Sequence, residues 1–344
     1  MINNYQINTI HQLLSETRRS LFKRKIHGKS REIPMIDRIR QEIETTRELC
    51  TQSTTKNCIT AINIFERFIN EKRPELKNQP ISCLTADHIK HFFAWNIQRG
   101  IRENTIACYM RSLRSVINRI IDNGGNLFIG VRTSNVRTAK RSIEVEDVRA
   151  IENIKLKKDS TQELARMIFL FCLYASGMPL IDAVFLKKKQ LSNGHITYYR
   201  HKTHRMVTVL VHSELERLIN QLSEDDSPYL LPIIRKDQNC DEKTQYRRFY
   251  QKYMRALRSI SKIIGTKEHL TSYIPRHTWA SLAYEIGNDI NPIGQLLGHT
   301  NSNTTKTYIR EIKTLQTDKV CISVMEYIKG TKSLKKHKLR QHYN

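Results

Sequence analysis

Residues 273–309 read YIPRHTWASLAYEIGNDINPIGQLLGHTNSNTTKTYI, the most informative stretch of the chain. Within it Arg276, His299 and Tyr308 follow one another at spacings of 23 and 9 residues. Helix-ending glycines such as Gly298 break the stretch into three successive short helices, which places these three side chains at helix ends. A guanidinium, an imidazole and a phenol gathered in this way suit phosphoryl transfer, which depends mainly on positioning and on donors aimed at the developing charge.

The composition indicates a polyanionic partner. The 344 residues include 58 Lys and Arg but only 33 Asp and Glu, giving a net charge of +25 and a pI near 9.9. Self-repulsion makes such an excess costly unless a polyanion such as nucleic acid neutralises it; a merely soluble basic protein is the alternative. No membrane partner is expected, because no run approaches the roughly 18 apolar residues of a spanning helix and the start does not read as a signal peptide.

The cysteines and histidines predict neither disulfides nor a metal. The seven cysteines are scattered without close pairs, which fits a reducing cytosol. His195, His201 and His204 come nearest to a metal cluster, but no Cys or carboxylate stands at ligand spacing. We therefore expect no metal, no other cofactor, three histidines facing solvent or DNA, and a cytoplasmic location.

Residues 36–130 predict a helical domain. The first helix is expected over 56–70 with Ser53 or Thr54 as its cap, and the second is capped by Thr85 and ended by Gly100. The third starts at Asn104 or Thr105 and carries the cleanest apolar stripe of the chain, ending before a Gly-Gly pair.

The polar face of the third helix is a candidate DNA surface. It carries Arg111, Arg114 and Arg119, and no acid stands between Asn104 and Ile121. A solvated charged face is the ordinary explanation, but the one-sided charge favours phosphate contact.

Basic segments flank and divide the domains. A basic arm is expected at 1–35, a polar linker at 131–142, a second domain at 143–330 and a basic tail at 331–344. Near the first domain and the linker we expect further DNA contacts from Arg102, Arg137, Lys140 and Arg141.

The second domain holds one strand-rich island in a helical surrounding. Over residues 194–211 a strand in which Ile196, Tyr198, Arg200 and Lys202 alternate onto one face is followed by a short turn and a β-branched return strand. The expected fold is therefore mainly α with a small antiparallel β-sheet, a helical domain followed by a mixed α/β domain.

The chain resembles the tyrosine recombinases, the family of phage-type integrases, Xer proteins and invertases that cut and rejoin DNA. The resemblance runs from about residue 40 to 330. It rests on the 273–309 stretch, on NTIACYMRSLRSVINRII with the basic linker after it, which resembles the SAM-like core-binding domain, and on YYRHKT, which resembles the hairpin with the family's catalytic lysine.

The resemblance implies a mechanism without metal or ATP. Tyr308 would attack the scissile phosphate to give a 3′-phosphotyrosine, and Lys202 would protonate the departing 5′ oxygen. Arg276 and His299 would stabilise the phosphate, with His299 donating to a non-bridging oxygen. The partners implied are double-stranded DNA with specific recombination sites and a homotetramer on two such sites.

Two departures from the family pattern concern its other cationic groups. The turn ASGMPLID has Ser176 and Pro179 where an arginine is expected, and Tyr273 stands where the family usually has histidine. We expect Arg200 to replace the arginine, as in a similar branch of integrases from bacterial mobile elements, with Arg205 as the second candidate. Tyr273 could donate a hydrogen bond but could not act as a base near neutral pH.

Two other functions stay open on the sequence. The departures fit a DNA-binding relative that has lost activity, and a type IB topoisomerase-like enzyme would use the same ester without strand exchange. Integration, excision and inversion are not distinguished. An amphipathic helix expected at 317–330 could dock on a neighbouring protomer or pack within its own.

Overall fold

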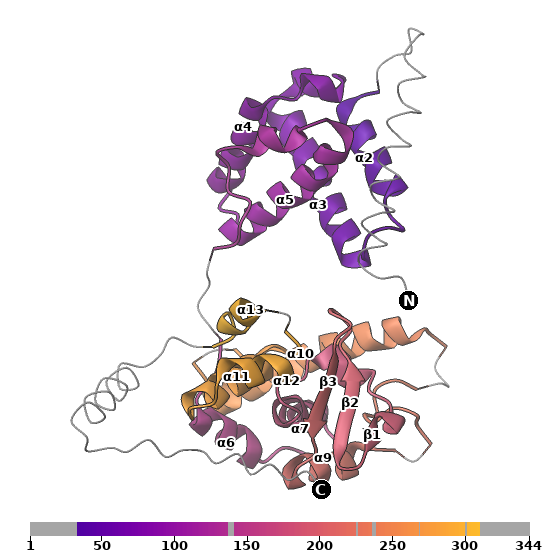
Figure 1. Cartoon of the computed structure of the whole chain (residues 1–344), viewed down its shortest axis with the longest axis vertical. Helices are drawn as coiled ribbons and strands as arrows, with labels where there is room; N and C mark the ends of the chain where they lie inside the picture. Colours follow the sequence, from indigo (N-terminus) through magenta and orange to yellow (C-terminus); the bar gives the residue numbers. More distant parts are fainter. Residues whose placement is uncertain are drawn as a thin grey trace, which may run out of the picture. The chain divides into compact units, whose positions relative to one another are not determined.

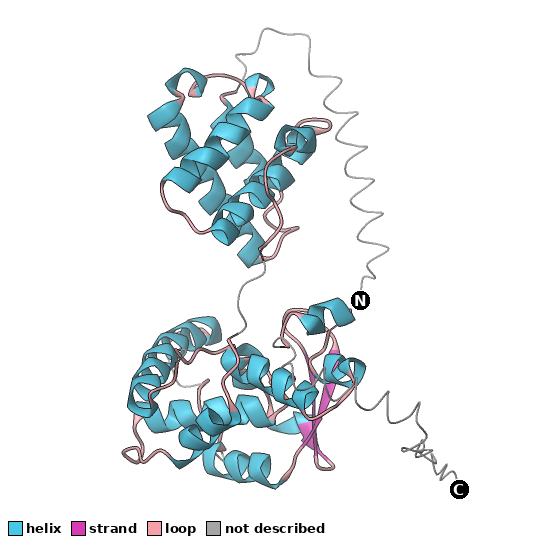
Figure 2. Ribbon diagram, turned by 90° about the vertical axis from the view of Figure 1, so that its left-hand side faces the viewer, coloured by secondary structure: helices cyan, strands magenta, loops and turns pink. Residues whose placement is uncertain are grey.

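Helices dominate the computed structural model (Figure 2), and the predicted fold class is confirmed. The structure describes residues 33–136, 141–224, 226–235, 239–267, 269–299 and 301–309. The chain divides into two compact units, Met1–Thr138 and Ala139–Asn344. The division falls inside the segment that the sequence marks as a linker.

The first unit is a helical bundle around an aromatic core. It contains α2 (Met35–Thr45), α3 (Gln52–Lys72), α4 (Ala86–Gln98) and α5 (Glu103–Ile120), with 3-10 turns at Pro74–Leu76, Ile81–Cys83 and Gly124–Phe128. The rings of Phe65 and Phe92 meet edge to face at 5.1 Å, and Phe68 packs beside both. Such pairs add to the area that each buried aromatic removes from water, so this cluster stabilises the bundle.

The helix ends of this unit follow local capping chemistry. Thr85 caps α4 as predicted, in a reciprocal capping box with His88. Gly100 ends it at φ +68°, with its N–H bonded to the Ile97 carbonyl. The predicted cap of α3 is wrong: Thr51 takes that place, because its hydroxyl accepts the Thr54 N–H at 3.2 Å.

Two of the arginines predicted to bind DNA are engaged within the first unit. The Arg119 Nε lies 3.3 Å from a carboxylate oxygen of Glu42, which is buried. The Arg111 Nη1 donates to the Thr133 carbonyl at 2.6 Å and to the Asn135 side chain at 2.9 Å. These contacts fix side chains and the start of the linker, and phosphate binding by either arginine stays a prediction.

The first half of the predicted linker is tied to α5. The Asn104 amide donates to the Val136 carbonyl at 3.1 Å and accepts the Val136 N–H at 2.6 Å. Arg102, Arg114 and Arg141 are exposed, which suits the DNA contacts predicted for them. Arg137 and Lys140 lie outside the described residues.

The second unit combines helices with a small sheet. Its helices are α6 (Val145–Asn153), α7 (Thr161–Tyr174), α8 (Leu180–Val184), α9 (Ser213–Leu222), α10 (Glu242–Ile264), α11 (Ile274–Glu285), α12 (Ile290–Leu296) and α13 (Ser302–Lys306). Its strands are β1 (Leu191–Ser192), β2 (His195–Tyr199) and β3 (Met206–Leu210), with a 3-10 turn at Lys188–Gln190. Figure 1 shows α7 in the middle of this unit and the strands at one side.

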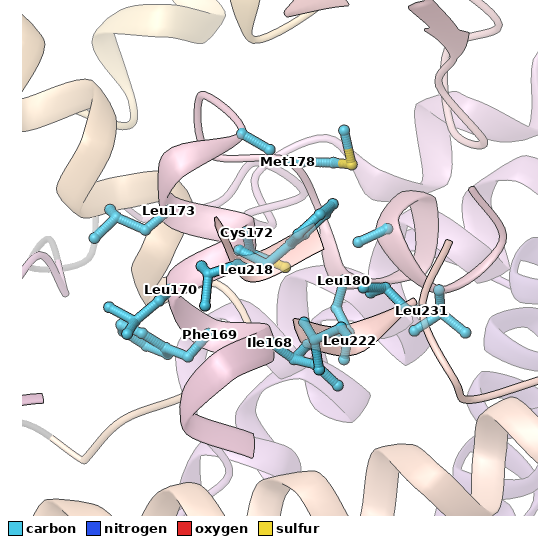
Figure 3. Close-up of a cluster of buried hydrophobic side chains, with 14 of the residues drawn as sticks. Ile168, Phe169, Leu170, Cys172, Leu173, Met178, Leu180, Leu218, Leu222 and Leu231 are labelled. Atoms are coloured by element: carbon cyan, nitrogen blue, oxygen red, sulfur yellow. The ribbon is translucent and has the colours of Figure 1, made fainter. Parts of the chain in front are cut away.

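Helix α7 organises the core of the second unit. It contacts α6, α9, α10 and α11, and its residues 168–173 are all buried. Figure 3 shows them against Met178 and Leu180 from the following turn and helix, with Leu218 and Leu222 from α9. The second half of α7 is apolar on every side and is covered on every side, so it holds the turn that follows the helix in place.

The sheet contains a strand that the sequence analysis missed. The order is β1-β2-β3, antiparallel throughout, with Leu191 opposite Ile196 and Tyr199 opposite Met206. Asn193 and Gly194 both have positive φ, the type I′ hairpin turn that an Asn-Gly pair favours. That pair was the available signal for β1.

Several predictions fall outside the described residues. They are the basic arm up to residue 32, the helix at 317–330 and the tail at 331–344. Residues 33–35 belong to the helical unit, since Met35 is fully buried in α2. None of the described helices is both long and apolar enough to cross a bilayer.

We expect Arg119→Ala to lower the free energy of unfolding by about 1–2 kcal/mol, because Glu42 is left buried without its closest cation. Arg114→Ala is the matched control on the same helix, with an exposed side chain and an expected change within about 0.5 kcal/mol. Urea unfolding of the full chain measures both. Equal losses would contradict a structural role for Arg119.

Candidate active site

Arg276, His299 and Tyr308 lie at the ends of three successive helices, as predicted. Arg276 is in the first turn of α11, after a proline that fits this position. His299 follows the cap of α12, and Tyr308 stands two residues past the end of α13. Tyr308 is therefore in the turn that follows α13.

Backbone hydrogen bonds at the end of α12 place His299. Gly298 has φ +64°, and its N–H bonds to the Gln295 carbonyl at 2.9 Å. The His299 N–H bonds to the Gly294 carbonyl at 2.9 Å, which completes a Schellman motif. A Cβ on Gly298 would lie 2.5 Å from the Arg200 Cδ, so this turn has room for glycine alone.

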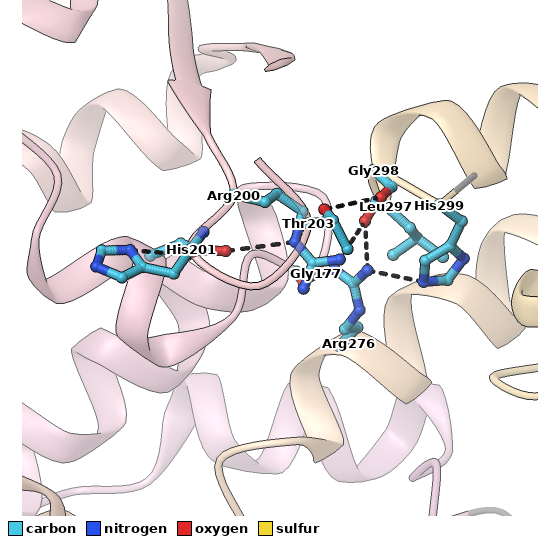
Figure 4. A network of polar contacts seen from close by, with 9 residues as sticks. Gly177, Arg200, His201, Thr203, Arg276, Leu297, Gly298 and His299 are labelled. Carbon is cyan, nitrogen blue, oxygen red and sulfur yellow. Dashed lines mark hydrogen bonds and ion pairs between the residues drawn. The ribbon is translucent and has the colours of Figure 1, made fainter. Parts of the chain in front are cut away.

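The Arg276 guanidinium is held by backbone carbonyls inside the unit. The residue is 2% exposed. Its Nη1 donates to the Gly177 carbonyl at 3.1 Å, and its Nη2 donates to the Leu297 carbonyl and to the His299 Nε2, the latter at 3.0 Å (Figure 4). Gly177 has φ +69°, and a Cβ there would meet the Arg276 Cα at 2.9 Å. The turn at Ser176 and Gly177, where the family pattern expects an arginine, thus supports Arg276 through its backbone.

Arg200 reaches the same carbonyl from the sheet. It is 7% exposed, and its Nη1 donates to the Leu297 carbonyl at 2.9 Å. Its Nε lies 3.4 Å from the Asp182 carboxylate, which also accepts the His201 N–H at 2.9 Å. The structure therefore brings Arg200 beside Arg276, where the sequence analysis expected a replacement arginine. Asp182 is not among the residues predicted for the site, although a carboxylate in the apolar sequence LIDAVF is one that needs a cation.

Lys202 lies in the hairpin turn rather than on a strand. The ladder ends at Tyr199, and the chain reverses when the His204 N–H bonds to the Arg200 carbonyl at 2.8 Å. Arg200 and Lys202 therefore do not share a strand face as predicted: Arg200 is buried and Lys202 is exposed.

The hairpin turn is fastened to the end of α12. The Thr203 hydroxyl lies 3.5 Å from the Gly298 carbonyl, and the Arg205 Nη1 donates to the His299 carbonyl at 3.1 Å. Arg205 therefore binds backbone from an exposed position, whereas Arg200 lies in the buried cluster. Figure 4 shows the His201 ring pointing away from Arg276 and His299, and its Nδ1 lies 3.3 Å from the Asp182 carboxylate.

Tyr308 packs among the cluster's rings and cations. Its ring centroid lies 4.7 Å from that of His277 and 5.0 Å from that of His299, and the Arg276 guanidinium carbon lies 5.2 Å from its centroid. Tyr273, at the cap of α11, is 55% exposed. Partial burial and nearby Tyr308 raise the pKa of Tyr273, so it is a neutral donor near pH 7.

His299 is neutral in this surrounding. Burial, together with Arg276, Arg200 and Lys202, lowers its pKa to about 3. Arginine can only donate, so the Nε2 that faces Arg276 is an acceptor and the ring proton is on Nδ1. The Nδ1 lies 3.0 Å from the Thr305 hydroxyl. The sequence predicted that His299 donates a hydrogen bond to a phosphate oxygen. In this arrangement its one ring N–H is already directed at the Thr305 hydroxyl.

The cluster carries an excess of positive charge. It holds two buried guanidinium groups, those of Arg200 and Arg276, against one buried carboxylate, that of Asp182. Burial and Arg200 lower the pKa of Arg276, as expected where cations crowd together. A bound monoanion would offset this excess. Among the described residues, no three His, Cys, Asp or Glu side chains are arranged to hold a metal ion.

Comparison with known proteins gives the family. The sequence profile of the Phage integrase family matches residues 141–314, and that of the Phage integrase SAM-like domain matches residues 34–125. The chain belongs to the phage integrase family. The resemblance stated from the sequence is confirmed.

Similar proteins agree with this assignment. The tyrosine recombinase XerC of Rickettsia bellii is 26% identical over 74% of this chain and 85% of its own length. That of Thermodesulfovibrio yellowstonii is 27% identical over 72% and 82%. The family match and these relatives identify the chain as a tyrosine-type site-specific recombinase.

Solved structures share the fold. The lambda integrase(75-356) dimer bound to a COC′ core site aligns with a TM-score of 0.60 at 15% identity, over 80% of this chain and 94% of that one. The XerH site-specific recombinase bound to a palindromic difH substrate aligns with a TM-score of 0.62 at 15% identity, over 87% and 98%.

We expect Gly298→Ala to lower the free energy of unfolding by about 3–5 kcal/mol. The new methyl group would clash with the Arg200 side chain, and the alanine would have to adopt the left-handed backbone conformation of the glycine. Gly265→Ala is the matched control: φ is +69° there too, but nothing lies within 4 Å of the added Cβ. It should lose only about 1–2 kcal/mol. Urea unfolding compares the two, and similar losses would show that the contact with Arg200 is unimportant.

Proposed function

We propose that this recombinase cleaves and rejoins DNA at specific sites through a 3′-phosphotyrosine on Tyr308. The observation that carries the proposal is the convergence of Arg200 and Arg276 on the Leu297 carbonyl, beside His299 and Tyr308. Two forked cations next to a phenol suit a phosphodiester, because guanidinium donors match the geometry of phosphate oxygens.

The proposed cleavage step is a displacement at phosphorus. Tyr308 loses its phenol proton to solvent as its oxygen forms a bond to the scissile phosphorus, and the bond from phosphorus to the 5′ oxygen breaks. Lys202, exposed on the hairpin turn, gives its proton to the departing oxygen. Arg276 and Arg200 stabilise the charge that develops on the non-bridging oxygens. Tyr273, at the cap of the helix that carries Arg276, is a neutral hydrogen-bond donor.

The proposed rejoining step reverses these events. The 5′-hydroxyl of a partner strand attacks the phosphotyrosine and gives its proton to Lys202, while the Tyr308 oxygen leaves and regains a proton from solvent. The energy of the cleaved bond is kept in the ester, so no ATP is needed.

The proposed partner is double-stranded DNA carrying recombination sites. The net charge of +25 supports it, since phosphate neutralisation supplies much of the affinity for DNA. Four protomers on two sites are proposed because a lambda integrase of the same fold was solved as a tetramer on a Holliday junction. Integration, excision or inversion of a mobile element would take place on the bacterial nucleoid in the cytoplasm.

The first test traps the covalent intermediate. With a nicked suicide substrate that carries a DNA site to which the protein binds, the full chain should form a protein–DNA adduct. Mass spectrometry should place this adduct on Tyr308. Tyr308→Phe should form none, since its ring packs alike but lacks the nucleophilic oxygen. An adduct on another residue would sink the proposed role of Tyr308, and no adduct under permissive conditions would leave an inactive DNA-binding relative. DNA relaxation without recombinant product from two sites would indicate topoisomerase-like activity.

The second test separates Arg200 from Arg205. Arg200→Ala should slow adduct formation about 100-fold or more, the scale of losing one oxyanion donor. Arg205→Ala should slow it less than about tenfold, because Arg205 binds the His299 backbone at an exposed site. Because Arg200→Ala leaves Asp182 buried without this cation, the double variant with Asp182→Asn serves as the folding control. Equal effects of the two single substitutions would contradict the replacement of the missing arginine by Arg200.

A further inference from the structure

A buried hydroxyl links the tyrosine-bearing segment to the histidine of the site. Thr305 lies on α13, three residues before Tyr308, and its relative exposure is 0%. Its Oγ1 lies 3.0 Å from the His299 Nδ1, and its carbonyl accepts the Tyr308 N–H at 2.9 Å. One residue therefore contacts both groups.

The packing of α13 on α12 fixes this hydroxyl in place. A Cβ built on Gly294 of α12 would lie 2.8 Å from the Thr305 Oγ1. The missing side chain of Gly294 thus makes room for the hydroxyl between the two helices. Because the residue is fully buried and closely packed, its Oγ1 has little freedom to leave the ring of His299.

The direction of each hydrogen bond follows from the donors present. The Arg276 Nη2 can only donate, so the Nε2 of neutral His299 accepts and its Nδ1 carries the proton. The Thr305 hydroxyl oxygen is then the acceptor of the Nδ1–H. Among the described residues, the other groups that face the histidine turn are cations or aromatic rings, namely Arg200, Lys202, Arg205 and Tyr308, and no carboxylate of this part of the chain competes for the proton.

We propose that Thr305 is a positioning residue, whose hydroxyl accepts the Nδ1–H of His299 and thereby holds the ring so that its Nε2 faces and orients Arg276. The order of contacts is Thr305, His299, Arg276 and then the phosphate. The inference rests on the function proposed above. It adds that the segment carrying the nucleophile also sets the orientation of the phosphate-binding arginine, so both are in place only when α13 is docked.

The experiment uses the full chain with Thr305→Ser, Thr305→Ala and Thr305→Val. Serine keeps the hydroxyl, alanine removes it without adding bulk, and valine replaces it by a methyl group of similar shape. Thr304→Val is the matched control, since Thr304 is the exposed neighbour on the same helix. All variants are first compared by thermal unfolding, so that a variant that does not fold is set aside and the remaining ones decide.

The first readout is the tautomer of His299 in the free protein. Nitrogen-15 NMR of histidine-labelled chain, assigned with His299→Gln, should show the Nδ1–H form in the wild type, in Thr305→Ser and in Thr304→Val. In Thr305→Ala and Thr305→Val the signals should average between the two tautomers. An Nε2–H form in the wild type, or an unchanged Nδ1–H form without the hydroxyl, overturns the proposal.

The second readout is the rate of adduct formation on a suicide substrate. Thr305→Ala and Thr305→Val should slow it about 10- to 100-fold, the effect of leaving one buried donor without its acceptor. Thr305→Ser and Thr304→Val should stay within about threefold of the wild type. If serine is as slow as alanine, the methyl group matters and the hydroxyl does not, which overturns the proposal. If the wild type forms no adduct, the proposed function fails, while the NMR still decides whether Thr305 sets the tautomer.

Discussion

The site depends on one peptide oxygen, the Leu297 carbonyl at the end of α12. It accepts hydrogen bonds from Arg276 of α11 and from Arg200 beyond β2, segments 76 residues apart in the sequence. A helix C-terminus concentrates negative partial charge on its last carbonyls, and a carbonyl oxygen has two lone pairs. It can therefore hold two buried cations side by side that would otherwise repel each other (Figure 4).

Glycines make this convergence possible. The Leu297 carbonyl points into the cluster because the next residue, Gly298, takes a left-handed backbone that a Cβ would block against Arg200. Gly177 does the same on the opposite side, where its own carbonyl accepts from Arg276. The groups that position the arginines are thus mostly backbone, which explains how a turn without the family's arginine still contributes to the site.

Protonation in the cluster follows from its charge. The positive excess around His299 disfavours the imidazolium and leaves a neutral ring, which can accept on one side and donate on the other. A chain of donors then runs from Arg276 through His299 to Thr305, next to Tyr308. The same excess that favours a phosphate also defines the direction of this chain, so anion binding and the geometry of the site have one electrostatic cause.

The sequence by itself determined the fold class and the helix-end placement of Arg276, His299 and Tyr308, and it predicted a polyanionic partner, because helix periodicity, capping residues and net charge are local or summed properties. Only the tertiary structure decided that Arg200 is buried beside Arg276 while Lys202 stays exposed, that Asp182 holds Arg200, and that Thr305 faces His299. The strand pattern did not reveal where the hairpin turns, since two backbone hydrogen bonds of Arg200, to Arg205 and to His204, close the turn. Contacts between side chains and distant backbone carbonyls follow no regular spacing in the sequence that could predict them. They form only when α7 and the helix ends around it pack together.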